Sequence, residues 1–292
     1  MVEIRTSRPE EMEAQKALWH SAFGDEPRYI DWFYQCCGRP ESLLVLLEDG
    51  KLASMLALLP QTLMLSGGER ASACYIYALA TDPAARSRGY VRQLLCHVDT
   101  YVKGLGVDCA TVVPAEPSLF KFFGTVNFAP CFATRKLELL RDMVGKDAGG
   151  ACARKVEPEE YNRLRDAKLD GLPGVRYGEE LIRYQQGLCR MRGGGLYRVE
   201  VDGQAGCAAA EYVDEGSVLF KELLIAPDKM ARAVAALAQQ LPGVRYHVRT
   251  PAGWDGLSGS YIQPFGMIKW YNEEKRQQWG QDSKGYMGLG FD

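Results

Sequence analysis

Five apolar side chains recur at helical spacing between residues 91 and 102. They are Val91, Leu94, Leu95, Val98 and Val102. Side chains three and four positions apart lie on one face of an α-helix, so the segment predicts an amphipathic helix packed on a core. An apolar run ending at residue 81 precedes it, and a basic loop with a proline and a glycine joins the two. The pattern therefore predicts a strand, a loop and a helix in succession.

Apolar runs bounded by Gly, Pro and Asp predict strands along the rest of the chain. In the first half the predicted strands are residues 2–5, 43–48, 52–65, 73–81, 109–113 and 133–139, with helices opening at Pro9, Pro27 and Pro117. In the second half they are residues 196–201, 206–212, 218–225 and 246–250, with helices opening at Pro158 and over residues 178–189 and 231–239. Asp49-Gly50 and Asp202-Gly203 each separate two strands and predict tight hairpin turns.

The two halves present these elements in the same order. Four pairs of landmarks match, with separations that drift along the chain: Pro9 and Pro158 (149 residues), Asp49 and Asp202 (153), Pro83 and Pro227 (144), and Pro114 and Pro251 (137). Shared order with a drifting offset is typical of a divergent internal repeat, and chance agreement is the alternative. The repeat predicts two domains, residues 1–145 and 154–292, joined by the Gly- and Ala-rich run 145–153.

Composition narrows the class of protein. The chain has 292 residues, which favours two domains over a single core, and 47% hydrophobic with 25% charged residues is typical of a globular protein. Its net charge of -2 argues against a general nucleic-acid binder. No apolar run is long enough to span a bilayer and the first residues lack a signal-peptide core, so we expect a cytoplasmic protein without membrane partners.

Cysteine and histidine usage gives no metal pattern. The nine cysteines are odd in number and include no Cys-x-x-Cys, and the three histidines lie far apart in sequence. This usage favours buried reduced thiols over disulfides and predicts no metal site.

The basic loop predicts an anion site. The first amides of a helix have no acceptor within the helix, and the helix dipole favours negative charge there. Arg86, Arg88 and Arg92 add positive charge around that point. A diphosphate is the ligand that such a loop suits best.

The segment Arg86-Ser87-Arg88-Gly89-Tyr90-Val91 resembles the acyl-CoA loop of the GNAT N-acetyltransferase superfamily, Arg/Gln-x-x-Gly-x-Gly/Ala, with Val at the last position. An unrelated αβ nucleotide binder with an Arg-Gly turn is the other interpretation. The resemblance implies an α/β (α+β) fold of two tandem GNAT-like domains, each a mixed, mostly antiparallel sheet flanked by helices. The second half has Asp228-Lys229-Met230-Ala231 instead, so we expect a degenerate copy that lines the acceptor groove.

The resemblance also implies cofactor contacts residue by residue. The strand before the loop should open at a bulge, so that the backbone of Leu79, Ala80 and Thr81 meets the pantetheine arm and the thioester. The diphosphate should contact loop amides and two arginine side chains, a set that comprises Arg86, Ser87, Arg88, Gly89, Tyr90, Val91 and Arg92. Phe123 stands where many members carry a tyrosine that protonates the leaving thiolate, and it is expected beside the cofactor without that role.

Three residues are candidates for the chemistry. Glu116 follows the next strand and is our candidate general base, although a carboxylate at a helix start explains it equally well. The amide of Leu79 or its neighbour is the candidate oxyanion donor. By analogy with Eis-type members, the Asp292 carboxylate is a third candidate.

The resemblance thus predicts an N-acetyltransferase that transfers an acetyl or short acyl group from acetyl-CoA to a primary amine. The amine would attack directly in a ternary complex, without a metal. The acceptor would be a small molecule or a peptidyl amine, and the protein a monomer or homodimer without nucleic-acid partners. The alternative is a non-catalytic acyl-CoA-binding sensor or scaffold.

Overall fold

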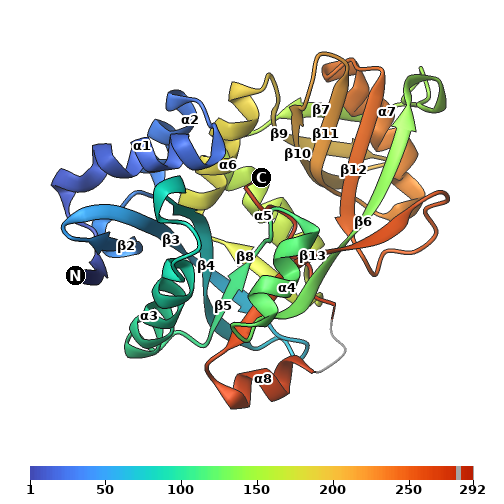
Figure 1. Cartoon of the computed structure of the whole chain (residues 1–292). Helices are drawn as coiled ribbons and strands as arrows, with labels where there is room; N and C mark the ends of the chain where they lie inside the picture. Colours follow the sequence, from blue (N-terminus) through green and yellow to red (C-terminus); the bar gives the residue numbers. More distant parts are fainter. Residues whose placement is uncertain (281–283, 292) are drawn as a thin grey trace. The chain divides into compact units, whose positions relative to one another are not determined.

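The structure is a computed structural model that describes residues 1–280 and 284–291. Contacts among its elements divide the chain into two units (Figure 1). The first unit contains Met1–Leu63, Glu69–Pro130 and Gly266–Gly280. The second contains Met64–Gly68, Cys131–Phe265 and the tail from residue 284. Each unit therefore combines segments that are distant in sequence.

The sheet of the first unit is mixed. Its strands are β1 (Val2–Thr6), β2 (Leu43–Glu48), β3 (Lys51–Met64), β4 (Arg70–Thr81), β5 (Cys109–Val112) and the end of β13 (Tyr261–Trp270). They lie in the order β1-β2-β3-β4-β5-β13. The pairs β1–β2, β2–β3 and β5–β13 are antiparallel, whereas β4 and β5 run parallel.

Helices cover both faces of this sheet. They are α1 (Met12–Phe23), α2 (Pro27–Cys36), α3 (Tyr90–Gly104), α4 (Pro117–Gly124) and α8 (Glu273–Trp279). The apolar stripe of α3 packs with Cys74 and Ile76 of β4. Tyr77 of β4 faces the other way and meets the rings of Trp19 and Phe33. Figure 1 shows α1 and α3 on opposite sides of β4 accordingly, as strand alternation requires.

Asp108 fixes the start of β5. Its carboxylate accepts hydrogen bonds from the Ser72 amide (2.7 Å), the Ser72 hydroxyl (2.9 Å) and the Asn272 side-chain amide (2.7 Å). Burial opposes the charge, but these donors hold the pKa of Asp108 below its ordinary value. The carboxylate thereby ties the β4–β5 pair to the segment that follows β13.

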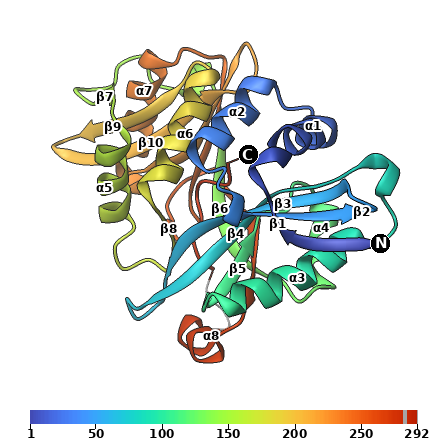
Figure 2. The same ribbon diagram turned by 90° about the vertical axis from the view of Figure 1, so that its left-hand side faces the viewer.

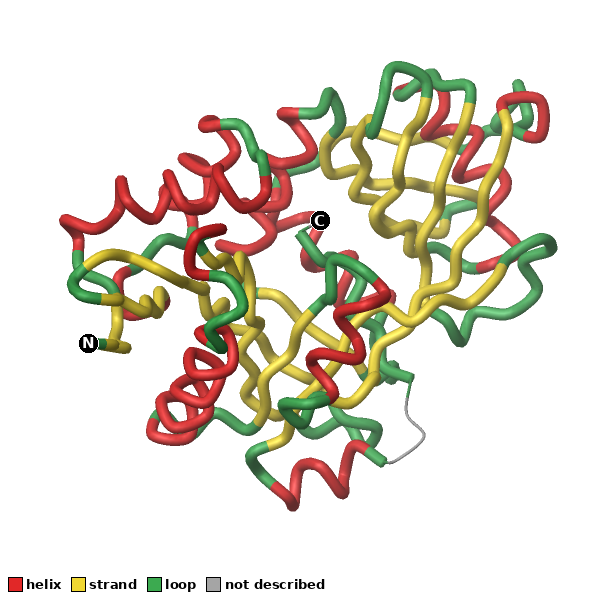
Figure 3. Tube along the Cα trace, viewed as in Figure 1, coloured by secondary structure: helices red, strands yellow, loops and turns green. Residues whose placement is uncertain are grey.

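The second unit also has a mixed sheet, and Figure 3 draws its strands in yellow. Its strands are β6 (Ala129–Leu140), β7 (Cys152–Lys155), β9 (Gly195–Val201), β10 (Gln204–Tyr212), β11 (Ser217–Leu224) and β12 (Arg245–Pro251), and a short strand β8 (Gly174–Tyr177) lies outside this order. The order is β7-β9-β10-β11-β12-β6. Only β11 and β12 are parallel among these pairs; β7–β9, β9–β10, β10–β11 and β12–β6 are antiparallel.

Three helices flank the second sheet. They are α5 (Pro158–Lys168), α6 (Glu179–Met191) and α7 (Met230–Gln240). The buried face of α7 packs on apolar side chains of β9 to β12. Figure 2 shows α5 and α6 beside β9 and β10, with which they are in contact.

The last strand of each sheet comes from the other half of the chain. β6 follows α4 in sequence but pairs with β12 in the second unit, and β13 follows β12 but its end pairs with β5 in the first. The units therefore differ from the consecutive domains 1–145 and 154–292 that the repeat predicts. Pairing between strands that are far apart in sequence cannot be recognised from local patterns. An internal repeat therefore predicts two sheets but does not show which segment supplies the last strand of each sheet.

Both predicted hairpin turns are confirmed. Asp49 and Gly50 have φ values of 49° and 78°, and Asp202 and Gly203 have 51° and 74°. Positive φ at both central residues is the conformation of a type I′ turn, which matches the twist of the adjoining strands.

Two further observations concern the side chains and helices that the structure describes. Burial raises the pKa of the Cys74 and Cys189 thiols to about 12, so both are protonated at neutral pH. Within residues 1–280 and 284–291, no helix is long and apolar enough to cross a membrane.

Candidate functional site

Strand β4 bends where the resemblance implies a bulge. Ala78 has φ 49°, an uncommon conformation for a residue with a side chain. The parallel pairing of β4 with β5 covers Ala73–Ile76 and Cys109–Val112 and ends just before this residue. The strands therefore diverge beyond Ile76, and residues 79–81 continue past the bend toward the loop.

The loop after β4 is built as a concave turn. Asp82 accepts a hydrogen bond from the Ala84 amide (2.8 Å), which closes the turn at Pro83. Farther along, Ser87 has φ 63° and Gly89 has φ 76°. Left-handed residues within such a turn direct successive backbone amides inward, an arrangement that binds anions.

Helix α3 begins at the end of this loop and adds its own amides. Its first regular hydrogen bond runs from the Gln93 amide to the Gly89 carbonyl (3.1 Å). The amides of Tyr90, Val91 and Arg92 precede that bond, so they have no acceptor within the helix. Gly89 is the N-cap, and a Cβ placed on it would meet no atom within 4 Å. The space beside these amides is therefore open.

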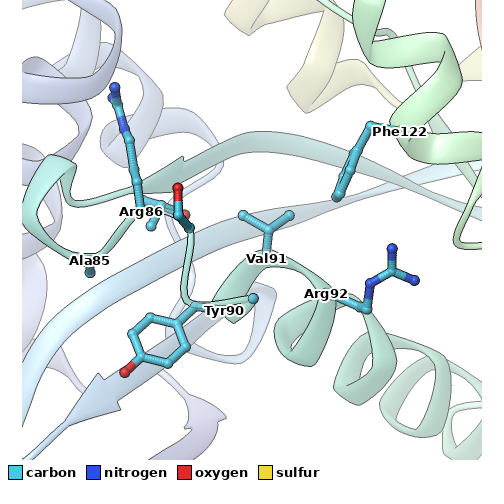
Figure 4. Close-up of a pocket in the computed structure, with 9 residues that line it drawn as sticks. Ala85, Arg86, Tyr90, Val91, Arg92 and Phe122 are labelled. Carbon is cyan, nitrogen blue, oxygen red and sulfur yellow. The ribbon is translucent and has the colours of Figure 1, made fainter.

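A pocket of about 240 Å³ lies at this point. Its walls are formed by Thr81, Ala85, Arg86, Ser87, Gly89, Tyr90, Val91, Arg92 and Phe122. In Figure 4 the side chains of Arg86, Val91 and Arg92 lie on the same side as Phe122, whereas the ring of Tyr90 lies on the other. The pocket thus combines helix-start amides, positive charge and an apolar wall, which suits an anion with an apolar extension.

The three arginines near the loop differ in their partners. Arg88 Nη1 lies 2.8 Å from both carboxylate oxygens of Glu48. Arg92 donates to the Thr125 hydroxyl (3.0 Å) and carbonyl (3.3 Å). Arg86 is exposed and forms no ion pair with any residue that the structure describes. Arg86 is therefore the arginine best able to pair with a bound anion.

Helix α4 presents Phe122 rather than Phe123 to the pocket. Phe123 is 5% exposed and packs in the core, with its ring 5.7 Å from that of Phe128 in an edge-to-face contact. Asn127, in the turn after this helix, takes φ 69°. Alignment to the family tyrosine predicts Phe123 beside the cofactor. The sequence does not point to Phe122 and Ala85, which line the pocket, or to the buried Ser54, whose hydroxyl contacts Thr81. A hydroxyl in an otherwise apolar strand was the available signal for Ser54.

The candidate catalytic residues fall in different surroundings. Glu116 is exposed at the N-cap of α4 and accepts a hydrogen bond from the Ser118 hydroxyl (3.3 Å). Leu79 is half-buried against the core of the first unit, one residue beyond the bend. Asp292 lies outside the described residues. Glu116 is not among the pocket-lining residues, and its role as base stays a prediction.

In the corresponding loop of the second unit, the positively charged side chains form ion pairs within that unit. Lys229 Nζ lies 2.9 Å from Asp202, and Arg232 Nη1 lies 2.8 Å from both oxygens of that carboxylate. No left-handed residue occurs between Pro227 and the start of α7. This loop therefore differs from the first in both its backbone conformation and the pairing of its charges.

A buried ion pair holds the tail of the second unit. Arg165 and Glu222 are fully buried with Nε 2.8 Å from Oε1, and Tyr161 and Tyr286 also donate to the Glu222 carboxylate. Arg165 donates as well to the Met287 carbonyl (3.0 Å). Burial opposes the charge, yet the carboxylate raises the pKa of Arg165 above its ordinary value. The tail is buried here, and it pairs with the rest of the unit through isolated bridges.

Among the described residues, the structure contains no group of three or more His, Cys, Asp or Glu side chains placed to hold a metal ion.

Comparison with known proteins shows what this chain is similar to. Residues 3–126 match the family described as acetyltransferase (GNAT) domain. No curated protein sequence matches the chain significantly. Many solved structures share its fold. A GCN5-related N-acetyltransferase from Anabaena variabilis superposes with a TM-score of 0.73 at 14% identity, over 94% of this chain and 74% of the other.

Two further structures resemble the chain over similar lengths. A probable N-acyltransferase from Enterococcus faecalis has a TM-score of 0.72 at 15% identity, covering 94% of this chain and 74% of its own. Eis1 from Mycobacterium abscessus has a TM-score of 0.66 at 15% identity, with 92% and 73% covered. At these identities the likeness establishes the GNAT fold across most of the chain.

Proposed function

We propose that this chain, whose residues 3–126 match the GNAT acetyltransferase domain, is an acetyltransferase that transfers an acetyl group from acetyl-CoA to a primary amine. The observation that carries the proposal is the pocket at the start of α3, next to the bend at Ala78. Helix-start amides suit the diphosphate of the cofactor. The bend leaves the end of β4 without a strand on its β5 side, where a pantetheine arm can pair with the backbone.

The groups that line the pocket suggest how the cofactor would be oriented. Amides of Gly89, Tyr90 and Val91 would hold the diphosphate, and Arg86 would add charge-assisted hydrogen bonds. The apolar wall of Val91 and Phe122 suits the methylene and methyl groups that follow in pantetheine. The thioester would then lie toward the bend in β4.

The reaction itself needs little from side chains. The neutral amine nitrogen attacks the thioester carbonyl carbon, the C–S bond breaks, and the amine proton leaves to a base or to water. A backbone amide near Leu79 would stabilise the oxyanion. Phe123 has no proton to give, so the leaving thiolate would take one from water. Glu116 is our candidate for the base.

The acceptor in this proposal is a small-molecule or peptidyl primary amine. The test incubates the purified protein with acetyl-CoA and a panel containing a polyamine, an aminoglycoside, an amino acid and a lysine peptide. Mass spectrometry follows an increase of one acetyl group on the acceptor. Acetylation above the uncatalysed rate supports the proposal, and a Gly89→Glu variant should abolish it.

A non-catalytic acyl-CoA-binding module is the second candidate. Two observations favour it: Phe123 replaces the usual proton donor, and Val91 stands at the loop position where the family pattern has Gly or Ala. This alternative predicts that acetyl-CoA binds without acetylation of any amine in the panel. Turnover with one amine is sufficient to reject it.

A further inference from the structure

The hydroxyl of Thr81 connects the pocket to the buried interior of the first unit. Thr81 is the last residue of β4, is half-buried and lines the pocket. Its Oγ1 lies 2.9 Å from Oγ of Ser54 on β3. Ser54 is fully buried, and its Oγ lies 2.7 Å from the carbonyl oxygen of Ala80. The pocket is thus linked to a chain of three polar groups.

The number of available protons decides which group donates and which accepts in each of these hydrogen bonds. The Ala80 carbonyl can only accept, so the single proton of the Ser54 hydroxyl is used there. At the contact between the two hydroxyls, Ser54 must then accept and Thr81 must donate. Thr81 has no second proton. Toward the pocket, its oxygen therefore offers lone pairs only.

Burial keeps this arrangement in place. Water does not reach Ser54 to supply another donor or acceptor, and an unpaired hydroxyl in that position would be costly. Thr81 is β-branched, and its side chain has few alternative rotamers in a strand. The acceptor is thus held ready before any ligand binds.

We propose that Thr81 Oγ1 accepts a hydrogen bond from an amide N–H of the bound ligand and so selects a CoA thioester over a plain nucleotide. This inference rests on the proposed function. The pantetheine arm of CoA carries two amides beyond the diphosphate, whereas ADP ends at its phosphate oxygens, which are acceptors. Thr81 is therefore a specificity-determining residue. Valine, which has the same branched shape but no oxygen, cannot make the contact.

The test compares three proteins and two ligands by calorimetry. Thr81→Val keeps the branched shape and removes the oxygen, and Thr81→Ser keeps the hydroxyl. Both leave the Ser54 bond to Ala80 available, and thermal melting checks that each variant is folded. The ligands are acetyl-CoA and ADP, which share the diphosphate; acetyl-CoA adds the pantetheine arm and a 3′-phosphate on the ribose.

Thr81→Val should bind acetyl-CoA about three- to tenfold more weakly than the unaltered protein, the range expected for one lost neutral hydrogen bond. Thr81→Ser should restore most of that affinity, and ADP should bind all three proteins equally. Equal acetyl-CoA affinity in Thr81→Val, or an equal loss of ADP affinity, overturns the inference while leaving the proposed function intact. Failure of the unaltered protein to bind acetyl-CoA overturns both.

Discussion

Arg86 and Arg88 stand two residues apart, yet the structure assigns them different tasks. Arg88 is engaged by both oxygens of Glu48 at 2.8 Å. Arg86 lines the pocket and has no ion-pair partner in the part of the chain that is described. We predict that Arg86→Ala weakens acetyl-CoA binding clearly and that Arg88→Ala changes it little.

The expected losses of affinity follow from the surroundings of the two arginine side chains. A hydrogen bond between charged groups contributes about 1.5–3 kcal/mol, and the exposure of Arg86 to solvent places it at the lower end of that range. Arg86→Ala should therefore weaken binding about tenfold. Arg88→Ala removes an exposed ion pair, whose effect on stability should be small because solvent screens the two charges. Its effect on affinity should stay within about threefold.

Calorimetry with acetyl-CoA at low and at physiological salt distinguishes these roles. The dependence of affinity on salt should become shallower in Arg86→Ala, because one charge no longer pairs with the diphosphate. Glu48→Gln is the matched control, since it releases Arg88 without changing the loop. The reasoning is refuted if Arg86→Ala binds like the unaltered protein, or if Arg88→Ala loses as much affinity.

Three further predictions concern stability. Ala78→Val should lower the free energy of unfolding by about 2 kcal/mol, because a β-branched residue resists positive φ, whereas Ala78→Gly should be neutral or stabilising. Equal losses of unfolding free energy for the two variants in denaturant titrations would contradict the bend. Asp108→Asn should be less stable than the unaltered protein above about pH 4. Because the pKa of Asp108 is lowered on folding, the gap should close as pH falls through that lowered value, and a gap independent of pH in acid titrations would argue against it. Glu222→Gln should cost about 3–5 kcal/mol by leaving Arg165 buried without its counter-charge, and a loss below about 1 kcal/mol in the same assay would exclude the buried ion pair.

Local sequence signals predicted the loop and its helix. Pro83 and Gly89 mark the turn and the helix start, and the spacing of Val91, Leu94 and Leu95 defines the buried face of α3. These features depend on residues within one or two turns of each other. They could therefore be recognised without knowledge of the remainder of the chain.

Side-chain direction within α4 could not be predicted in the same way. Successive residues of a helix point about 100° apart, so a small rotation decides which of two neighbouring phenylalanines meets the pocket. Here Phe123 packs on Phe128 in the core, and Phe122 faces the pocket as a consequence. That rotation is set by tertiary contacts.

Strand partners and ion-pair partners were also beyond local patterns. The pairing of β13 with β5 joins residues more than 150 positions apart, as Met267 opposite Val112 shows. Likewise, glutamate side chains are rarely buried, and only the fold reveals that Glu222 is buried and that Arg165 neutralises it. Contacts of this kind follow from the assembled sheet.

The central claim is that the start of α3 holds the diphosphate of acetyl-CoA. The most direct measurement is calorimetric titration of the unaltered protein, Gly89→Glu and Gly89→Gln with acetyl-CoA. Both variants share the strain of a side chain at φ 76°, and the space beside Gly89 accommodates either one, so only the charge separates them. We expect binding that is weakened in Gly89→Gln and lost in Gly89→Glu. Absence of binding by the unaltered protein, or equal affinity in the two variants, would contradict it.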